Sequence, residues 1–388
     1  MKKLISTALT AYFCALFPFS GFALETVSPP IQDFRINAKA AIVMEPVTGR
    51  ILFAHNIDER LPIASTTKIM TALIALEQPN IDAVFPVDEA AIMVEGSSMG
   101  LQKGDRASLR ALATGMLLAS GNDAANATAV RISGSIPAFV AMMNERAKEM
   151  GLLDTSFETP SGLDGEKHYS TAKELALITR EALKNDEFAQ ICSQYRIRTS
   201  YGNPPYERWL TNHNRLLRDY EGTFGVKTGF TRKSGRCLVT AARRNGVELI
   251  CITLSASNDW NVHKSLYNHF FGILQLEDLS EGIPAFTVPV TGGVSPAVAA
   301  VKFDAAKIPI LAAGAKVEYK IISEPFLYAP VKRGQYIGEA RIFLDGEQVS
   351  CVTLTAGSDV AMLHEYKEKV SILDRIIKLV GLDEKLYG

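Results

Sequence analysis

Two stretches that read as β-hairpins enclose a long helical block, and this arrangement constrains the fold more than any other feature of the chain. The first hairpin has predicted strands at 40–45 and 51–55. The second has predicted strands at 235–243 and 247–256. Apolar periodicity predicts helices at 65–78, 107–118, 122–132, 137–150, 171–184 and 262–274. Strands at both ends of a helical block indicate one α/β unit whose sheet is completed when the chain returns.

The second hairpin also determines what its two cysteines can do. An Asn-Gly pair at 245–246 is typical of a two-residue turn, which places Thr240 opposite Cys251 and Leu254 opposite Cys237. The two cysteines therefore do not face each other across the strands. We expect both to be free, buried thiols that pack as small hydrophobic side chains.

The chain of 388 residues exceeds one typical domain, and its character changes after about Leu279. Residues 284–362 hold short alternating runs separated by turns, which predicts a small all-β domain and leaves 24–279 for the larger one. From 366 to 380, apolar residues recur at helical spacing with basic residues between them. The segment 363–388 therefore reads as an amphipathic helix, either docked on the β domain or lying in a membrane interface.

The segment 1–23 resembles a secretory signal peptide. Lys2 and Lys3 form a basic start, an apolar run reaches about Phe19, and the small residues Gly21 and Ala23 precede a cleavage site. A buried first helix or a membrane anchor is the alternative, but the apolar run is short for a spanning helix. We therefore expect an exported protein.

The segment Ser65-Thr66-Thr67-Lys68 carries the strongest chemical signal, because it opens a predicted helix. Residues i and i+3 lie on one helical face, so the Lys68 amine can reach the Ser65 hydroxyl. A serine needs an adjacent base to act as a nucleophile, and a lysine can serve if burial or nearby positive charge lowers its pKa. The pattern also fits a serine N-cap followed by a surface lysine, so alone it does not establish catalysis.

Two further elements change this interpretation. Residues 120–122, Ser-Gly-Asn, lie between two apolar helices and would otherwise read as a turn with an Asn N-cap. Residues 227–229, Lys-Thr-Gly, open a predicted strand that would otherwise be an ordinary edge strand. S-x-x-K, S-D-N and K-T-G together are the signature of class A β-lactamases and penicillin-binding proteins. The order is kept here, with Gly121 in place of the middle Asp, which indicates an active-site serine acyltransferase.

The sequence resembles the low-molecular-mass penicillin-binding proteins that act as D-alanyl-D-alanine carboxypeptidases. The likeness covers about residues 36–275 and includes the stretches that begin at Ala40, Pro62, Leu117, Thr159, His168, Asn212 and Gly225. The resemblance implies a β-lactamase/transpeptidase-like α/β (α+β) domain with an antiparallel sheet flanked by helices. It also implies that 284–362 and the terminal helix correspond to that family's second domain and membrane anchor.

The resemblance implies roles for the first two elements. Ser65 would attack the carbonyl between the two D-alanines of a peptidoglycan pentapeptide and become the acyl-enzyme, while Lys68 takes its proton. Ser120 would relay a proton to the leaving D-alanine, and Asn122 would hold Lys68 and the substrate amide in place. β-Lactams would acylate the same serine as inhibitors.

The third element is implied to bind substrate. Lys227 and Thr228 would bind the terminal carboxylate, and the peptide would lie along the strand that contains Gly229. The oxyanion hole would be the backbone N–H groups of Ser65 and Phe230.

One departure from the family concerns the substrate carboxylate. Some members place an Arg after the second hairpin, whereas residues 257–264 contain none and offer only Lys264 as a substitute. The sequence therefore predicts that the positive charge of the site comes from Lys68 and Lys227. The further partner of the carboxylate stays open.

Two other function classes compete with the carboxypeptidase. A class A-like β-lactamase would need a Glu to activate the deacylating water, and Glu207 is the nearest candidate but has the wrong spacing and context. A non-catalytic exported wall-binding protein would not need the intact set of Ser65, Lys68, Ser120 and Lys227.

The remaining features point away from metals, cofactors and nucleic acid. The six histidines show no ligand spacing, and a net charge of −1 without a basic run argues against a nucleic-acid surface. We predict local structural roles for His168, Asp123 and Asp164, and make no prediction of oligomeric state. The expected location is the periplasmic face of the inner membrane, with peripheral attachment to the membrane surface.

Overall fold

The computed structural model describes residues 36–311 and 315–363, which divide into two compact units after Gln275. The predicted signal peptide and the helix predicted at 366–380 lie outside the described residues. In the described part of the chain, no helix is long and apolar enough to cross a membrane.

The first unit is built on a five-stranded sheet that both predicted hairpins form together, as expected. All its described pairings are antiparallel, and β1 joins the hairpins because Ala40 pairs with Leu254 of β9. In order across the sheet the strands are β2 (Ile51–His55), β1 (Ala40–Met44), β9 (Val247–Leu254), β8 (Gly235–Arg244) and β7 (Thr223–Thr231). The strand that carries Lys-Thr-Gly is therefore an edge strand.

The register of the second hairpin agrees with the Asn-Gly prediction. Arg244 pairs with Val247 and Thr240 with Cys251, and both turn residues have positive φ angles. Cys237 and Cys251 are buried free thiols, as predicted.

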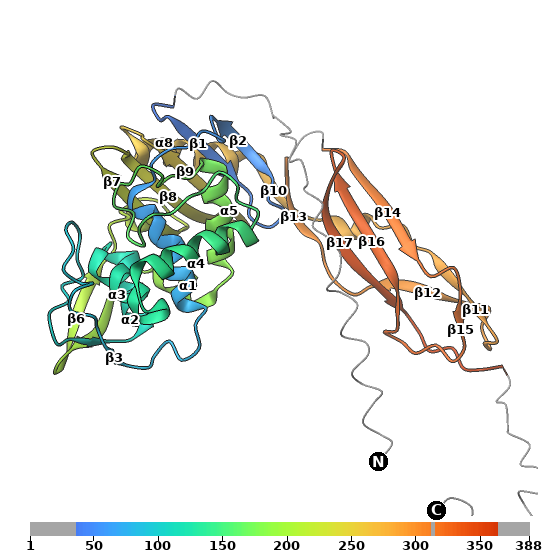
Figure 1. The fold of residues 1–388 in the computed structure, drawn as a ribbon. Helices are drawn as coiled ribbons and strands as arrows, with labels where there is room; N and C mark the ends of the chain where they lie inside the picture. Colours follow the sequence, from blue (N-terminus) through green and yellow to red (C-terminus); the bar gives the residue numbers. More distant parts are fainter. Residues whose placement is uncertain (1–35, 312–314, 364–388) are drawn as a thin grey trace, which may run out of the picture. The chain divides into compact units, whose positions relative to one another are not determined.

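Some helices of this unit pack against the sheet, and others pack against one another. The α5 and α8 helices contact the sheet, and α1 to α4 contact one another (Figure 1). The predicted helices are present with small shifts of their ends: α1 (Lys68–Leu76), α2 (Leu109–Leu118), α3 (Asn122–Ser133), α4 (Ile136–Glu149), α5 (Ala172–Leu183) and α8 (Asp259–Ile273). The elements without a prediction are β3 (Phe85–Pro86), β4 (Arg106–Ala107), α6 (Asp186–Ser193), β5 (Arg196–Gly202), β6 (Pro205–Thr211) and α7 (Leu216–Asp219).

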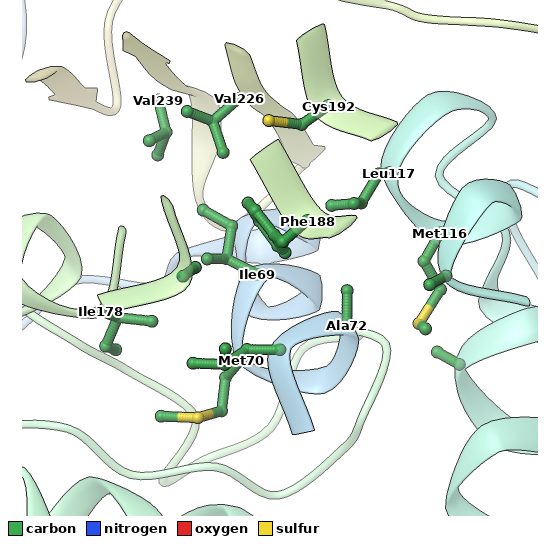
Figure 2. Packing of buried hydrophobic residues seen from close by; sticks show 14 of the residues in the cluster. Ile69, Met70, Ala72, Met116, Leu117, Ile178, Phe188, Cys192, Val226 and Val239 are labelled. Atoms are coloured by element: carbon green, nitrogen blue, oxygen red, sulfur yellow. The ribbon is translucent and has the colours of Figure 1, made fainter. Parts of the chain in front are cut away.

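The α1 helix is the centre of the core, and every one of its residues is buried. Figure 2 shows Ile69, Met70 and Ala72 among side chains from helices α2, α5 and α6 and from the sheet. Burial of a side chain as large as Ile69 or Met70 contributes about 1.5–3 kcal/mol. This packing fixes the helix, and with it the turn η1 (Ala64–Thr67) that leads into it.

The second unit confirms the predicted all-β domain. Its hairpin of β16 (Tyr336–Leu344) and β17 (Glu347–Ala356) turns at residues 345–346, as the Asp-Gly pair indicates. A six-stranded sheet has the order β14-β16-β17-β12-β11-β15, and β10 pairs with β13. The remaining elements are β10 (Leu274–Asp278), η2 (Leu279–Gly282), β11 (Thr287–Thr291), β12 (Ala297–Lys302), β13 (Lys307–Leu311), β14 (Val317–Ser323) and β15 (Leu327–Tyr328).

Candidate active site

Ser65 lies in the turn η1, immediately before the buried helix α1. The turn is held by its own residues: Thr66 donates from its backbone N–H to Ile63 O, and the Thr67 hydroxyl donates to Ala64 O. Lys68 follows one turn later, and its Nζ lies 3.0 Å from Ser65 Oγ. The predicted contact between the serine and lysine side chains is therefore present.

The Lys68 side chain is completely buried. Its Nζ also lies 2.7 Å from Asn122 Oδ1 and 2.5 Å from the Ser161 backbone oxygen. Burial lowers the pKa of Lys68 well below its ordinary value, and the nearby charge of Lys227 lowers it further, with Asp123 acting in the opposite direction. The amine is therefore neutral over a wider range of pH than a surface lysine.

The Ser-Gly-Asn element forms the junction between α2 and α3. Ser120 has a positive φ of 59°, which turns the chain between the helices. A Cβ at Gly121 would lie 2.9 Å from the Met99 backbone nitrogen and 2.6 Å from Asp123 Oδ1. The glycine that departs from the S-D-N pattern is thus required by close packing at this junction. Asn122 is anchored by donation from its Nδ2 to Glu95 O.

Lys227 approaches from the edge strand β7 and is also buried. Its Nζ donates to Ser120 Oγ at 3.0 Å and to the backbone oxygen of Thr228 at 2.7 Å. Burial lowers the pKa of Lys227 to about 7. The structure therefore joins Ser65, Lys68 and Asn122 in one hydrogen-bonded group, and Ser120 with Lys227 in another.

Gly229 brings the backbone of β7 against the turn that carries the serine. A Cβ at this position would lie 3.1 Å from Ile63 O and 3.2 Å from the Ser65 backbone nitrogen. Such distances are tighter than ordinary van der Waals contact, so glycine is needed for this approach. Phe230 follows and is 64% exposed.

One pocket of the described structure joins these elements. Lys68, Asn122 and Lys227 are not among its lining residues, and all three side chains are buried. Its wall is formed by Ser65, Ser97, Ser120, His213, Thr228, Gly229, Phe230, Arg236, Cys237 and Trp260. Five of these ten residues, Ser65, Ser120, Thr228, Gly229 and Phe230, belong to the three motifs or to the predicted oxyanion hole. The site is thus assembled from η1, the α2–α3 junction and β7.

The expectation that Lys68 and Lys227 alone supply the positive charge of the site was wrong. Arg236 of β8 lines the pocket, whereas Lys264 is not among the lining residues. Sequence reasoning also missed Ser97, His213 and Trp260. The signal that could have found Arg236 is the hairpin register, because Arg236 pairs with Phe230, the residue next to Lys-Thr-Gly.

The three residues with predicted structural roles form hydrogen bonds, most of them with segments distant in the sequence. His168 Nδ1 accepts the Glu158 backbone N–H, and its Nε2 lies 2.7 Å from Thr67 Oγ1. Burial lowers the pKa of His168 to about 4. Asp123, in the first turn of α3, accepts from the backbone N–H groups of residues 99–101. Asp164 accepts from the Thr231 hydroxyl.

A class A-like β-lactamase would need a carboxylate in the pocket to activate water, and the described lining residues include none. Glu207 lies on β6, where its exposed carboxylate pairs with Arg198. No Asp or Glu is among the described residues that line the pocket. Within 36–311 and 315–363, no three His, Cys, Asp or Glu side chains gather into a group that could hold a metal ion.

Known proteins share both the sequence and its division into units. Residues 24–258 match the D-alanyl-D-alanine carboxypeptidase family, and residues 312–362 match the C-terminal domain of penicillin-binding protein 5. D-alanyl-D-alanine carboxypeptidase DacF of Bacillus subtilis is 36% identical over 66% of this chain and 67% of its own. DacC of Escherichia coli is 31% identical over 87% of this chain and 87% of its own.

Solved structures agree with the sequence comparison. Penicillin binding protein 5 from Haemophilus influenzae has a TM-score of 0.66 and 29% identity, over 86% of this chain and 99% of its own. The Streptomyces K15 DD-transpeptidase has a TM-score of 0.59 and 29% identity, over 64% of this chain and all of its own. The family match spans more than half of this chain. The chain therefore belongs to the D-alanyl-D-alanine carboxypeptidases, a family of serine peptidases that act on the cell wall.

Proposed function

We propose that the protein removes the terminal D-alanine from peptidoglycan pentapeptides through an acyl-enzyme on Ser65, and that β-lactams acylate the same residue. The observation that carries this proposal is the environment of Lys68. A neutral lysine amine has two N–H donors and one lone pair. Asn122 Oδ1 and Ser161 O can only accept, so they take the two donors. The lone pair then faces Ser65 Oγ, which is the arrangement of a general base.

Acylation follows from this arrangement. Ser65 Oγ attacks the carbonyl carbon between the two D-alanines, and its proton passes to Lys68 Nζ. The negative charge that develops on the carbonyl oxygen is stabilised by the backbone N–H groups of Ser65 and Phe230. The approach of β7 to the turn at Gly229 supports this pairing, because it brings the two backbone segments into contact.

Departure of D-alanine requires a proton on its nitrogen. Ser120 is placed to relay it, since its hydroxyl accepts from Lys227 Nζ and lines the pocket beside Ser65. The C–N bond then breaks, and D-alanine leaves as the neutral amine. Water subsequently attacks the ester, which releases the shortened peptide and restores the Ser65 hydroxyl.

The edge position of β7 supports a binding mode for the peptide. An edge strand has backbone N–H and C=O groups on one side that no neighbouring strand occupies. An extended peptide can add to such an edge by β-augmentation, with its backbone pairing along residues 228–230. This places its scissile bond at the turn that carries Ser65.

Labelling with a fluorescent penicillin tests the assignment of the nucleophile. The wild-type protein should form a covalent adduct, and Ser65→Ala should form none. A matched control is Ser193→Ala, because that serine lies on α6, where its hydroxyl donates to Gln190 O and accepts from Gln194 Nε2, and it is not among the residues that line the pocket. Label that persists in Ser65→Ala would show that another residue is the nucleophile.

A further inference from the structure

Arg236 lines the pocket although it belongs to none of the three motifs. It lies on β8, one strand in from the edge, and pairs directly with Phe230 of β7. Residues paired in this way point to the same face of a sheet. The Arg236 side chain forms part of the pocket wall and is 42% exposed, so a ligand in the pocket can reach it.

The guanidinium is held in place from one side. Asp259, whose side chain is only 2% exposed, accepts from Arg236 Nε at 3.0–3.1 Å and from Nη2 at 3.0 Å. Trp260 stacks with it, with the guanidinium carbon 5.4 Å from the ring centroid. Among the described residues, none pairs with Nη1. An arginine fixed along its Nε–Nη2 edge still has free donors on its far end.

The substrate of a D-Ala-D-Ala carboxypeptidase ends in a free carboxylate beside the scissile bond. Lys227 is fully buried, and its Nζ already donates to Ser120 and Thr228. With a pKa of about 7, Lys227 also loses its charge near neutral pH. A guanidinium stays charged and presents paired donors that match the geometry of a carboxylate.

We propose that Arg236 binds the C-terminal carboxylate of the substrate through its Nη1 end, with Thr228 beside it and Asp259 and Trp260 as positioning residues. This inference rests on the proposed function. The carboxylate-binding arginine of this chain would then lie in β8. The segment 257–264, where some members of the family carry such an arginine, contains none. A free-acid terminus would therefore be preferred over a neutral one.

The test compares two substrates that differ only at that terminus. Diacetyl-L-Lys-D-Ala-D-Ala and its C-terminal amide are each assayed for kcat/KM with wild type and Arg236→Gln. Hydrogen bonds to charged groups contribute enough for a loss of about 10- to 100-fold on the acid. The amide should change by less than about threefold, because it lacks the carboxylate. The acid-to-amide ratio should therefore collapse.

Arg215→Gln is the matched control. Arg215 stacks on the same Trp260, with its guanidinium carbon 5.2 Å from the ring centroid, but it does not line the pocket. Its ratio should remain that of wild type. If Arg236→Gln fails to fold, Arg236→Lys is assayed in its place. Lysine keeps a positive charge beside Asp259, but its single amine cannot bind the Asp259 carboxylate and the substrate carboxylate as the guanidinium does. A lowered ratio in that variant supports the proposal.

Two outcomes are clearly separated. Equal losses on acid and amide, or an unchanged ratio in the Arg236 variants, overturn the assignment of Arg236 and leave the proposed function intact. Failure of the wild-type protein to cleave either peptide overturns the proposed function itself, and the inference about Arg236 falls with it.

Discussion

At the scale of single residues, chemistry depends on which partners surround the Lys68 amine. The local spacing of Ser65 and Lys68 is enough to predict their contact, because one helical turn brings them together. The acceptors that bind the amine, and that would leave its lone pair for Ser65 in the proposed mechanism, come from distant parts of the chain, Asn122 and the Ser161 carbonyl. Ser161 could not be assigned from spacing, since only tertiary packing brings its carbonyl to the site. Arg236 could have been found only through the register that pairs it with Phe230.

Lys68→Arg tests the role of the amine. Arginine keeps a positive charge and several donors but does not give up its proton at ordinary pH, so it cannot act as a base. Acylation by penicillin should slow by about 100- to 10,000-fold, the range contributed by general-base catalysis. The measurement is the second-order rate of adduct formation. A rate within tenfold of wild type would rule Lys68 out as the base.

At the scale of elements, close approaches of backbone decide where the motifs can lie. The hairpin at Asn245-Gly246 was predictable to the residue, because turn type fixes register. The hairpin of β5 and β6 had no prediction, since most of its residues are exposed or half-buried and its buried Tyr201 is held by a distant carbonyl, Met99 O. The need for glycine at position 121 likewise appears only once Met99 is seen beside it.

Gly121→Asp therefore gives a prediction that sequence pattern alone would reverse. The substitution recreates S-D-N, yet its Cβ would lie 2.9 Å from Met99 N and 2.6 Å from Asp123 Oδ1. We expect lower stability, by about 1–3 kcal/mol as in other overpacked sites, and slower acylation. Denaturant unfolding and penicillin labelling measure both.

Gly272→Ala is the control for the substitution at Gly121. Gly272 lies in α8 with open space around its Cβ position, so alanine there should be neutral or stabilising by up to about 1 kcal/mol. If Gly121→Asp were as stable and as reactive as this control, the account of the junction would be wrong.

At the scale of the whole molecule, the two buried lysines link stability to pH. The folded-state pKa of Lys227 is about 7, whereas an unfolded lysine titrates near ~10.4. Between these values the unfolded chain binds more protons, so stability rises with pH from about 7 upward and is lost as pH falls toward 7. Burial of the two lysine amines therefore lowers the free energy of unfolding near neutral pH.

Lys227→Met should flatten this dependence. From pH 7.5 to 9, its free energy of unfolding should rise less steeply than that of wild type, by up to about 1.4 kcal/mol per pH unit. Urea unfolding at several pH values measures the two slopes. Lys68 contributes in the same direction in both proteins, so it largely cancels. Equal slopes would mean that Lys227 stays charged in the folded state.

The sequence patterns at 1–23 and 366–380 support a proposal for the location of the protein. We propose that the protein is exported and held at the periplasmic face of the membrane by an amphipathic helix at 366–380. Deletion of residues 363–388 should release it to the soluble fraction with its rate of acylation by penicillin unchanged. Fractionation and labelling measure the two properties. Retention of the truncated protein on membranes would contradict the proposed anchor.

The central claim is that Ser65 removes one D-alanine from a pentapeptide. The most direct measurement is mass spectrometry of a peptidoglycan pentapeptide ending in D-Ala-D-Ala after incubation with wild type or Ser65→Ala. The account predicts loss of a single alanine with wild type and no change with the variant. An unchanged pentapeptide with wild type, or cleavage by Ser65→Ala, would contradict it.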